Sequence, residues 1–484
     1  MSWAFLQDFG PIGMLLLGAA ACAGVDLRGA GRDGSGAASR WVALAALVLA
    51  FAASIGFWHS SFGPTPPDIE HGSLVVDRFA LFFYAATLAA AAAVLLCGAD
   101  SESELDPHRG VFHLLLLMST AGVLFTASSA DVISMAAGLA LALLPVGLAQ
   151  GLHKTDPDAV RSAARALSVS GFSLATLVGG LVLLAGLAGT TSLREIPVGL
   201  HQVDPLLVVA AIMLVLGAGL QLGVFPFLWW RAEEGPRPPA GPYLAATLLG
   251  SLAAAAALLR LLPGALAAAP STWTMAVAVL AGATLVLAPL LAWRQRRLGR
   301  AVLYLLGAQL ALGLATLPEI SQSGTATILY LLLCTIPLGA ALLGLLGAVS
   351  AQGEGDAVSD LRGLWARSPA LAGGLVLLLL GLAGLPPTAG FFARLMTADS
   401  ALHAGLGWLS WLELLSAVLC ILVVFRWLLT ILDARADGPV LELPGRTTLV
   451  GIGLCLAAVL SFGVLVGPLF AIASRGALPP LIGP

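Results

Sequence analysis

The chain has 484 residues, of which 59% are hydrophobic and only 10% are charged, and its formal net charge is −3. Soluble domains carry about 25% charged residues, so this composition excludes a water-soluble protein and indicates one embedded in a lipid bilayer. The small negative charge gives no reason to expect a nucleic-acid partner. The five cysteines stand singly in apolar stretches and not at metal-ligand spacing, so we expect no metal site.

Fourteen apolar stretches approach the length of about 20 residues that a helix needs to cross a bilayer. The connections between them are short, so we expect no separate folded domain. The expected fold class is an all-α polytopic membrane protein, with one membrane domain over residues 1–484. The expected spans are 9–26, 41–58, 78–97, 111–129, 131–150, 165–188, 205–230, 242–263, 272–292, 300–317, 325–349, 369–402, 409–432 and 447–472.

Basic residues are concentrated in the connections that follow odd-numbered spans. The connection at 27–40, for example, carries three arginines, and the one near 294–300 carries four. Because basic residues stay in the cytoplasm, these connections are expected to be cytoplasmic and both termini periplasmic or outer. The opposite connections hold only Arg78, Arg194, Arg260 and Arg475.

Prolines interrupt two of the expected spans. Pro226 lies in the seventh span, and Pro386 and Pro387 lie together in the twelfth. Proline removes a backbone donor and clashes with the preceding turn, so each position predicts a helix break. Broken helices at membrane depth commonly form ion or proton sites, whereas the alternative is an ordinary helix end at the membrane surface. Apolar chain resumes after Arg394, which favours membrane depth for the second break.

The two interrupted spans lie five helices apart, so they cross the membrane in opposite directions. That arrangement is typical of an inverted repeat. We therefore expect two inverted five-helix repeats with helices 7 and 12 broken. The expected parts are 1–110 (helices 1–3), 111–263 (helices 4–8), 272–432 (helices 9–13) and 447–472 (helix 14).

Several motifs fall in the order and spacing of a known family. LAGLPPTAGFF at 382–392 resembles the most recognisable motif of the antiporter-like subunits of respiratory complex I, and the similarity is greatest to the subunit N family of bacterial NADH–quinone oxidoreductases. Further stretches that carry this resemblance are VVDRFALFF (75–83), FHLLLLMSTAGVLFTASSADVISMAAGL (112–139), LQLGVFPFLWW (220–230), LLAWRQRRLGRAVLY (290–304) and DLRGLWARSP (360–369).

The resemblance implies a place in the proton-pumping membrane arm of a bacterial inner-membrane complex. Its expected partners are the lipid bilayer and other membrane subunits of a complex I-like or antiporter assembly. NAD, flavin, iron–sulfur and quinone sites are then expected in partner subunits and none in this chain, which would be a non-catalytic subunit of a translocase.

The chain departs from the family where the family carries titratable residues. The resemblance implies a glutamate on helix 5, lysines on helices 7 and 8, a histidine or lysine on helix 10, and a lysine after the second break. Arginine stays charged at any accessible pH, so it cannot carry a proton as lysine does. At these positions this chain has Ala140 on helix 5, Gln221 on helix 7, Leu249 on helix 8, Gln309 on helix 10 and Arg394 after the second break.

Three hypotheses follow from these departures. In the first, the chain keeps the fold, has lost its own proton channel, and holds neighbours together while passing on coupling. In the second, it works in an Mrp-type cation/proton antiporter or a bicarbonate-uptake complex, with Arg394 as an anion or gating charge. In the third, it is a pumping subunit N whose protons follow water held by Gln221 and Gln309.

Other polar residues allow narrower expectations. Asp399 is a candidate counter-charge for Arg394, and Asp131 is placed to stabilise the start of helix 5. Arg426 is either a buried packing charge or reaches water, and it does not face Glu413 on the same helix. The GxGxxG pattern at 29–34 and the single lysine, Lys154, both read as parts of solvated loops.

Overall fold

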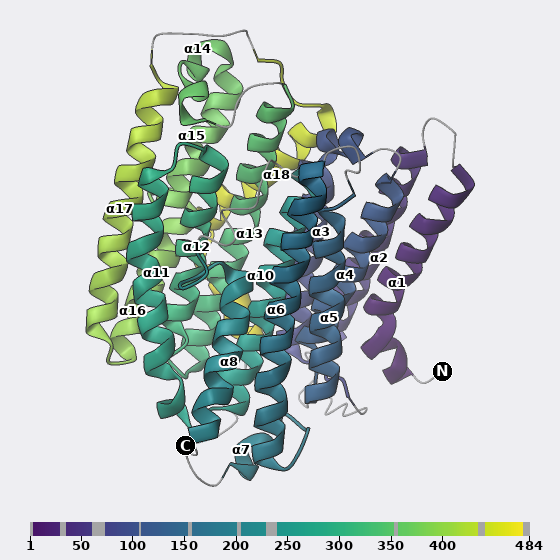
Figure 1. Ribbon diagram of the computed structural model, residues 1–484, viewed down its shortest axis with the longest axis vertical. Coiled ribbons are helices and arrows are strands. Elements are labelled where there is room, and N and C mark those ends of the chain that lie inside the picture. The colour runs from purple at the N-terminus through teal and green to yellow at the C-terminus, as the bar shows by residue number, and fades with distance from the viewer. Residues whose placement is uncertain are drawn as a thin grey trace.

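The computed structural model describes residues 3–29, 35–60, 73–105, 108–152, 157–200, 205–228, 240–352, 357–433 and 441–477. The glycine pattern beyond Gly29 and Lys154 lie outside the described residues. Long helices run side by side in one bundle, with α1 (Trp3–Gly29) and α2 (Ser35–Ser60) at one edge and α17 (Gly407–Ile431) at the other (Figure 1). The other helices are α3 (Arg78–Cys97), α4 (Arg109–Ala127), α5 (Val132–Ala149), α6 (Pro157–Ala188), α7 (Ile196–Gly199), α8 (Pro205–Leu222), α10 (Ala240–Arg260), α11 (Thr274–Arg294), α12 (Leu298–Thr316), α13 (Gln322–Ala351), α14 (Leu364–Arg367), α15 (Pro369–Ala383), α16 (Ala389–His403), α18 (Arg446–Val464) and α19 (Val466–Gly476).

Among the described residues, 13 helices are long and apolar enough to cross a membrane. The sequence predicts fourteen spans, and the difference arises at 369–402. That stretch forms α15 and α16, each of 15 residues, because the backbone leaves the helix between them. The expected last span, 447–472, also divides, into α18 and α19 at Leu465.

The centre of the bundle is formed by α13 and α10. In their most apolar windows 94% and 89% of the residues are buried, compared with 28% for α2 and 33% for α17. Leucine and alanine dominate this interior, and small side chains allow helix backbones to approach closely. At Gly122 on α4, a Cβ would collide with backbone atoms of Leu141 and Ala142 on α5. The peripheral helices therefore present their apolar faces to lipid or to other subunits.

Asp131 caps α5, as the sequence predicts. Its carboxylate accepts a hydrogen bond from the Ser134 N–H at 2.7 Å, and the Ser134 side chain completes a capping box. We expect Asp131→Ala to lower the free energy of unfolding by about 1 kcal/mol, because the cap satisfies an otherwise unpaired helix donor. Unfolding of the purified protein in detergent measures this. Asp399→Ala, which removes an exposed carboxylate, is the control, and an equal loss in both variants would contradict the capping role.

Buried charges tie the first helices together. Arg40 on α2 donates to Glu102 at 2.9 and 2.7 Å, and Glu102 lies 3.3 Å from His113 on α4. His113 and Glu102 are 0% and 1% exposed. Since a buried charge is costly unless paired, this network fixes α2 and α4 in register near one end of the bundle.

Candidate functional site

The first helix break lies at the end of α8. The helix stops at Leu222, Gly223 takes a positive φ of 67°, and Pro226 follows three residues later. The freed Phe225 N–H donates to the Thr284 hydroxyl of α11 at 2.9 Å. Gln221, 7% exposed, lies against α10, where a Cβ on Gly250 would come within 2.9 Å of its Oε1.

The second break, between α15 and α16, has the same layout. Gly384 has φ 75°, and Pro387 follows three residues later as the second of the Pro386–Pro387 pair. The Thr388 hydroxyl donates to the Leu385 carbonyl at 2.7 Å, which satisfies one of the freed acceptors. The chain thus leaves and re-enters the helix at Ala389, as the prolines predict.

One helix, α12, touches both breaks. A Cβ on its Gly307 would lie 2.7 Å from the Gly223 carbonyl oxygen, so only glycine allows this approach. Less than one turn further, Gln309 donates from Nε2 to the Leu382 carbonyl at 2.9 Å. Gln309 is 2% exposed, so it acts here as a buried support for the second break.

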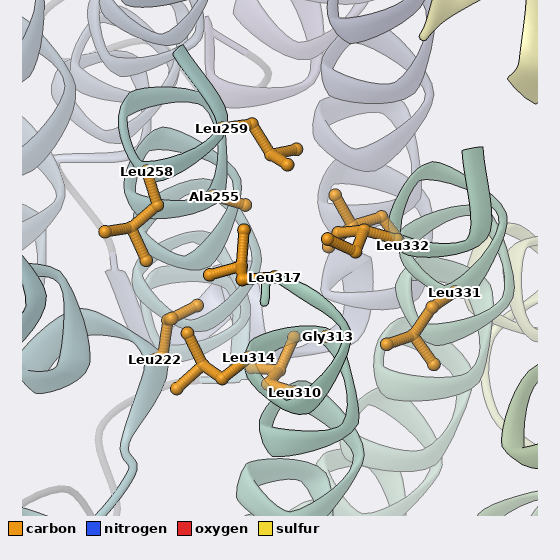
Figure 2. Close-up of a pocket in the computed structure, with 11 residues that line it drawn as sticks. Leu222, Ala255, Leu258, Leu259, Leu310, Gly313, Leu314, Leu317, Leu331 and Leu332 are labelled. Carbon is orange, nitrogen blue, oxygen red and sulfur yellow. The ribbon is translucent and has the colours of Figure 1, made fainter. Parts of the chain in front are cut away.

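A cavity of about 30 Å³ lies between α8, α10, α12 and α13 (Figure 2). Leu222 and Leu310, which directly follow Gln221 and Gln309, are part of its wall. Figure 2 shows leucine side chains from several helices around the gap. A cavity needs polar partners to hold water, and one lined by leucine stays dry. The full lining is Leu222, Ala255, Leu258, Leu259, Leu310, Gly313, Leu314, Leu317, Ile328, Leu331 and Leu332.

Arg394 lies beyond the second break, buried at 7% exposure. It lies against Gly384, whose missing side chain leaves room for the Arg394 Cδ and Nε. Its Nη2 is 3.4 Å from the Cys420 sulfur on α17, and its carbonyl accepts from the Thr397 hydroxyl at 3.0 Å. The same hydroxyl lies 2.9 Å from the Glu413 carboxylate, which is 3% exposed.

Glu413 is the residue of this site that the sequence analysis does not identify. The signal was available, because α16 and α17 are joined by only three residues, 404–406. A short connection makes two helices antiparallel neighbours. Positions at similar distances from it then face each other, which brings Thr397 opposite Glu413.

The expectation that Asp399 neutralises Arg394 is wrong. Asp399 is 68% exposed and lies 3.5 Å from His403, its i,i+4 neighbour. Five residues along a helix amount to about 1.4 turns, so Asp399 and Arg394 point in different directions. Arg426 is exposed and donates to the Trp293 carbonyl at 2.8 Å, with its guanidinium over the Trp293 ring.

The remaining candidate positions are separated in space. Leu249 is fully buried on α10, beside the glycine that contacts Gln221. Ala140 lies half-buried on α5, which packs mainly against α4, α6 and α10. The structure therefore places Gln221 and Leu249 at the first break, and Gln309 and Arg394 at the second.

Comparison with known proteins identifies the fold and the family. Residues 129–420 match the family described as NADH:quinone oxidoreductase/Mrp antiporter, TM. The chain is 34% identical to NADH-quinone oxidoreductase subunit N 1 of Sorangium cellulosum over 408 residues, 80% of each chain. A chain of respiratory complex I from Thermus thermophilus superposes with a TM-score of 0.78 at 22% identity, covering 96% of this chain and 99% of that one.

A chain of the Mrp complex from Dietzia sp. has a TM-score of 0.82 at 18% identity and covers 98% of this chain and 97% of its own length. These structural likenesses establish the complex I antiporter-like fold, and the sequence matches establish kinship. The protein is therefore a multi-pass membrane protein that belongs to the NADH-quinone oxidoreductase subunit N family, an antiporter-like family whose transmembrane domain is shared with the Mrp antiporters.

Proposed function

We propose that the chain is a membrane-arm subunit of a proton-pumping NADH–quinone oxidoreductase or a related complex, and that its own transmembrane proton channel is degenerate. Its role is then structural: it holds neighbouring membrane subunits and passes on electrostatic or mechanical coupling. Redox cofactors belong to partner subunits. The membership in the subunit N family supports the assembly, and the neutral residues at Ala140, Gln221, Leu249 and Gln309 support the degenerate channel.

The observation that carries the degenerate channel is the dry cavity beside the two glutamines. A proton wire needs groups or waters that accept and donate hydrogen bonds, and alkyl side chains do neither. The wall of the cavity next to Gln221 and Gln309 consists of leucine, isoleucine, alanine and glycine. A route that joined the first break to the second through this region would have to cross it without polar support.

The proposal includes a membrane topology of fourteen crossings. Here α15 and α16 together form the twelfth crossing, and residues 111–263 and 272–432 are inverted repeats. The matching breaks support this, because Gly223 and Gly384 both have positive φ and both precede a proline by three residues. The arginine distribution supports both termini on the periplasmic side of a bacterial inner membrane.

The test is the number of protons pumped per electron by the purified assembly in liposomes, driven by NADH and a quinone. We expect Gln221→Leu and Gln309→Leu to leave this ratio unchanged, because neither side chain carries a proton. The positive control is loss of the corresponding lysine in a neighbouring antiporter-like subunit, which should lower the ratio. Loss of pumping in either glutamine variant, with the assembly intact, would mean that protons do use this chain.

The second candidate is a subunit of an Mrp-type cation/proton antiporter or a related ion or bicarbonate transport complex. The fold likeness to a chain of the Mrp complex and the buried cation at Arg394 favour it. Cation-dependent proton exchange by an assembly without NADH–quinone reductase activity would support this function and exclude the first.

A further inference from the structure

A row of buried polar side chains lies on one face of α17. Glu413, Ser416 and Cys420 are spaced i, i+3 and i+7, which places them on the same side of a helix. They are 3%, 0% and 0% exposed. Across from them on α16 lie Arg394 and Thr397, at 7% and 0%. In a bundle whose interior is mainly apolar, this polar layer requires an explanation.

The hydrogen-bond inventory of this layer is incomplete. Arg394 uses Nη2 toward Cys420, but its Nε and Nη1 have no hydrogen-bond partner among the described residues. Glu413 Oε1 and Ser416 Oγ also lack one within the described part of the chain. Unpartnered buried polar atoms are rare and costly, because each has given up its bonds to water. The layer therefore holds a guanidinium, a carboxylate oxygen and a hydroxyl, which can donate to or accept from water.

The Thr397 hydroxyl lies between the Glu413 carboxyl group and the backbone carbonyl of Arg394. Its hydroxyl has one proton and lies within hydrogen-bond distance of both the Arg394 carbonyl and Glu413 Oε2. When Glu413 is ionised, the hydroxyl can donate to Oε2. When Glu413 is protonated, the hydroxyl can donate to the Arg394 carbonyl instead and accept from the acid. The local geometry therefore accommodates both forms of the carboxyl group.

We propose that Glu413 is a proton-binding site, with Arg394 as a fixed cation beside it and Thr397 as a positioning residue. A proton delivered by water forms an O–H bond at a Glu413 oxygen, and release returns it to water. The pair Arg394–Glu413 then changes its net charge from zero to plus one, while the guanidinium itself keeps its protons. This deepens the proposed function, on which it rests, by naming a group through which the subunit responds to its neighbours.

The site communicates with one end of the bundle. Glu413 lies six residues from the start of α17, about 9 Å along the axis. Ser410, one turn closer to that end, donates to the Ala398 carbonyl at 2.8 Å, and the exposed Asp399–His403 pair lies on the same hairpin. This end of the bundle is therefore the nearer source of a proton for Glu413.

Apart from the exposed Asp399–His403 pair on α16, the charged groups that the structure describes on the helices packed against α17 lie toward its far end. Arg426 contacts Trp293 at the end of α11, and Arg362 pairs with Asp433 beyond α17, so Arg294 and Asp360 belong to that end as well. Arg300 and Tyr304 lie in the first two turns of α12, directly after the α11 end, and α15 has no titratable residue. Arg394 is therefore the charge that acts directly on Glu413.

The test is infrared difference spectroscopy of the assembly-bound subunit in lipid during pH titration. We expect a carboxylic-acid C=O band that appears as the pH falls, is lost in Glu413→Gln, and is retained in the control Asp399→Asn on the same hairpin. Thr397→Val should keep the band and shift it to higher frequency, because the hydrogen bond to the carboxyl group is gone. That shift separates a positioning role from a purely structural one.

A spectrum in which Glu413→Gln and the wild type show the same acid bands at every pH would overturn the proposal, because Glu413 would then be permanently ionised. The proposal would also be overturned if the band survived in Glu413→Gln but vanished in Asp399→Asn, because the band would then belong to Asp399. This readout does not involve pumping, so its failure would leave the proposed function in place. Conversely, a failed pumping test would leave the band assignment unchanged.

Discussion

Arg394→Gln is expected to destabilise the protein by about 1–3 kcal/mol, because it leaves the Glu413 carboxyl group buried without a cation nearby. Arg394 and Glu413 are both more than nine-tenths buried, so water cannot replace the lost interaction cheaply. The measurement is the free energy of unfolding in detergent or lipid.

The double variant Arg394→Gln/Glu413→Gln provides the control. The double variant leaves no buried charge without a partner, so it should be more stable than Arg394→Gln alone. The coupling energy between the two substitutions should then be well above the uncertainty of additivity. Additive losses would mean that the two side chains do not interact. Asp399→Asn gives a third comparison, and we expect little change from it because Asp399 is exposed.

Gly463→Ala is the second change with a large expected effect. A Cβ at Gly463 on α18 would collide with the Pro387 carbonyl and with backbone atoms of Thr388 and Ala389, so α18 rests directly on the second break. Backbone cannot swing aside as a side chain can, so we expect a loss of about 1–3 kcal/mol, as for other overpacked sites. Thermal unfolding of the purified protein measures the change.

Gly453→Ala on the same helix is the matched control. A Cβ there would meet nothing within 4 Å, and alanine favours helix over glycine, so stability should hold or rise by up to about 1 kcal/mol. If both variants lost similar amounts of stability, the contact between Gly463 and the second break would not be the cause of the loss in Gly463→Ala.

The spans and breaks could be predicted from the sequence, whereas the buried contacts could not. A long apolar stretch has few alternatives to a membrane helix, and a proline marks its interruption locally, so Pro226 and Pro387 located both breaks. The count of fourteen was less secure, because α15 is too short to qualify as a span alone. Hydropathy cannot reveal that a stretch of continuous apolar character is two helices of 15 residues.

The candidate site was predicted only in part. The motif identifies Arg394, but the sequence places its candidate counter-charge at Asp399 on the same helix, where helical geometry turns the side chain outward. The contact between Thr397 and Glu413 is tertiary, and the sequence indicates it only through the short connection at 404–406 between α16 and α17. The leucine-lined cavity is likewise a product of packing among four helices, and no stretch of sequence encodes it alone.

The position of α12 has a consequence for how the chain responds to force. Gly307 contacts the first break and Gln309 donates to the second, so α12 connects the two broken helices by direct contacts as well as through the chain. A tilt of α12 would therefore move both broken helices together. A force that an adjoining subunit exerts on one broken helix would thus displace the other through α12, and no ion would have to cross between them.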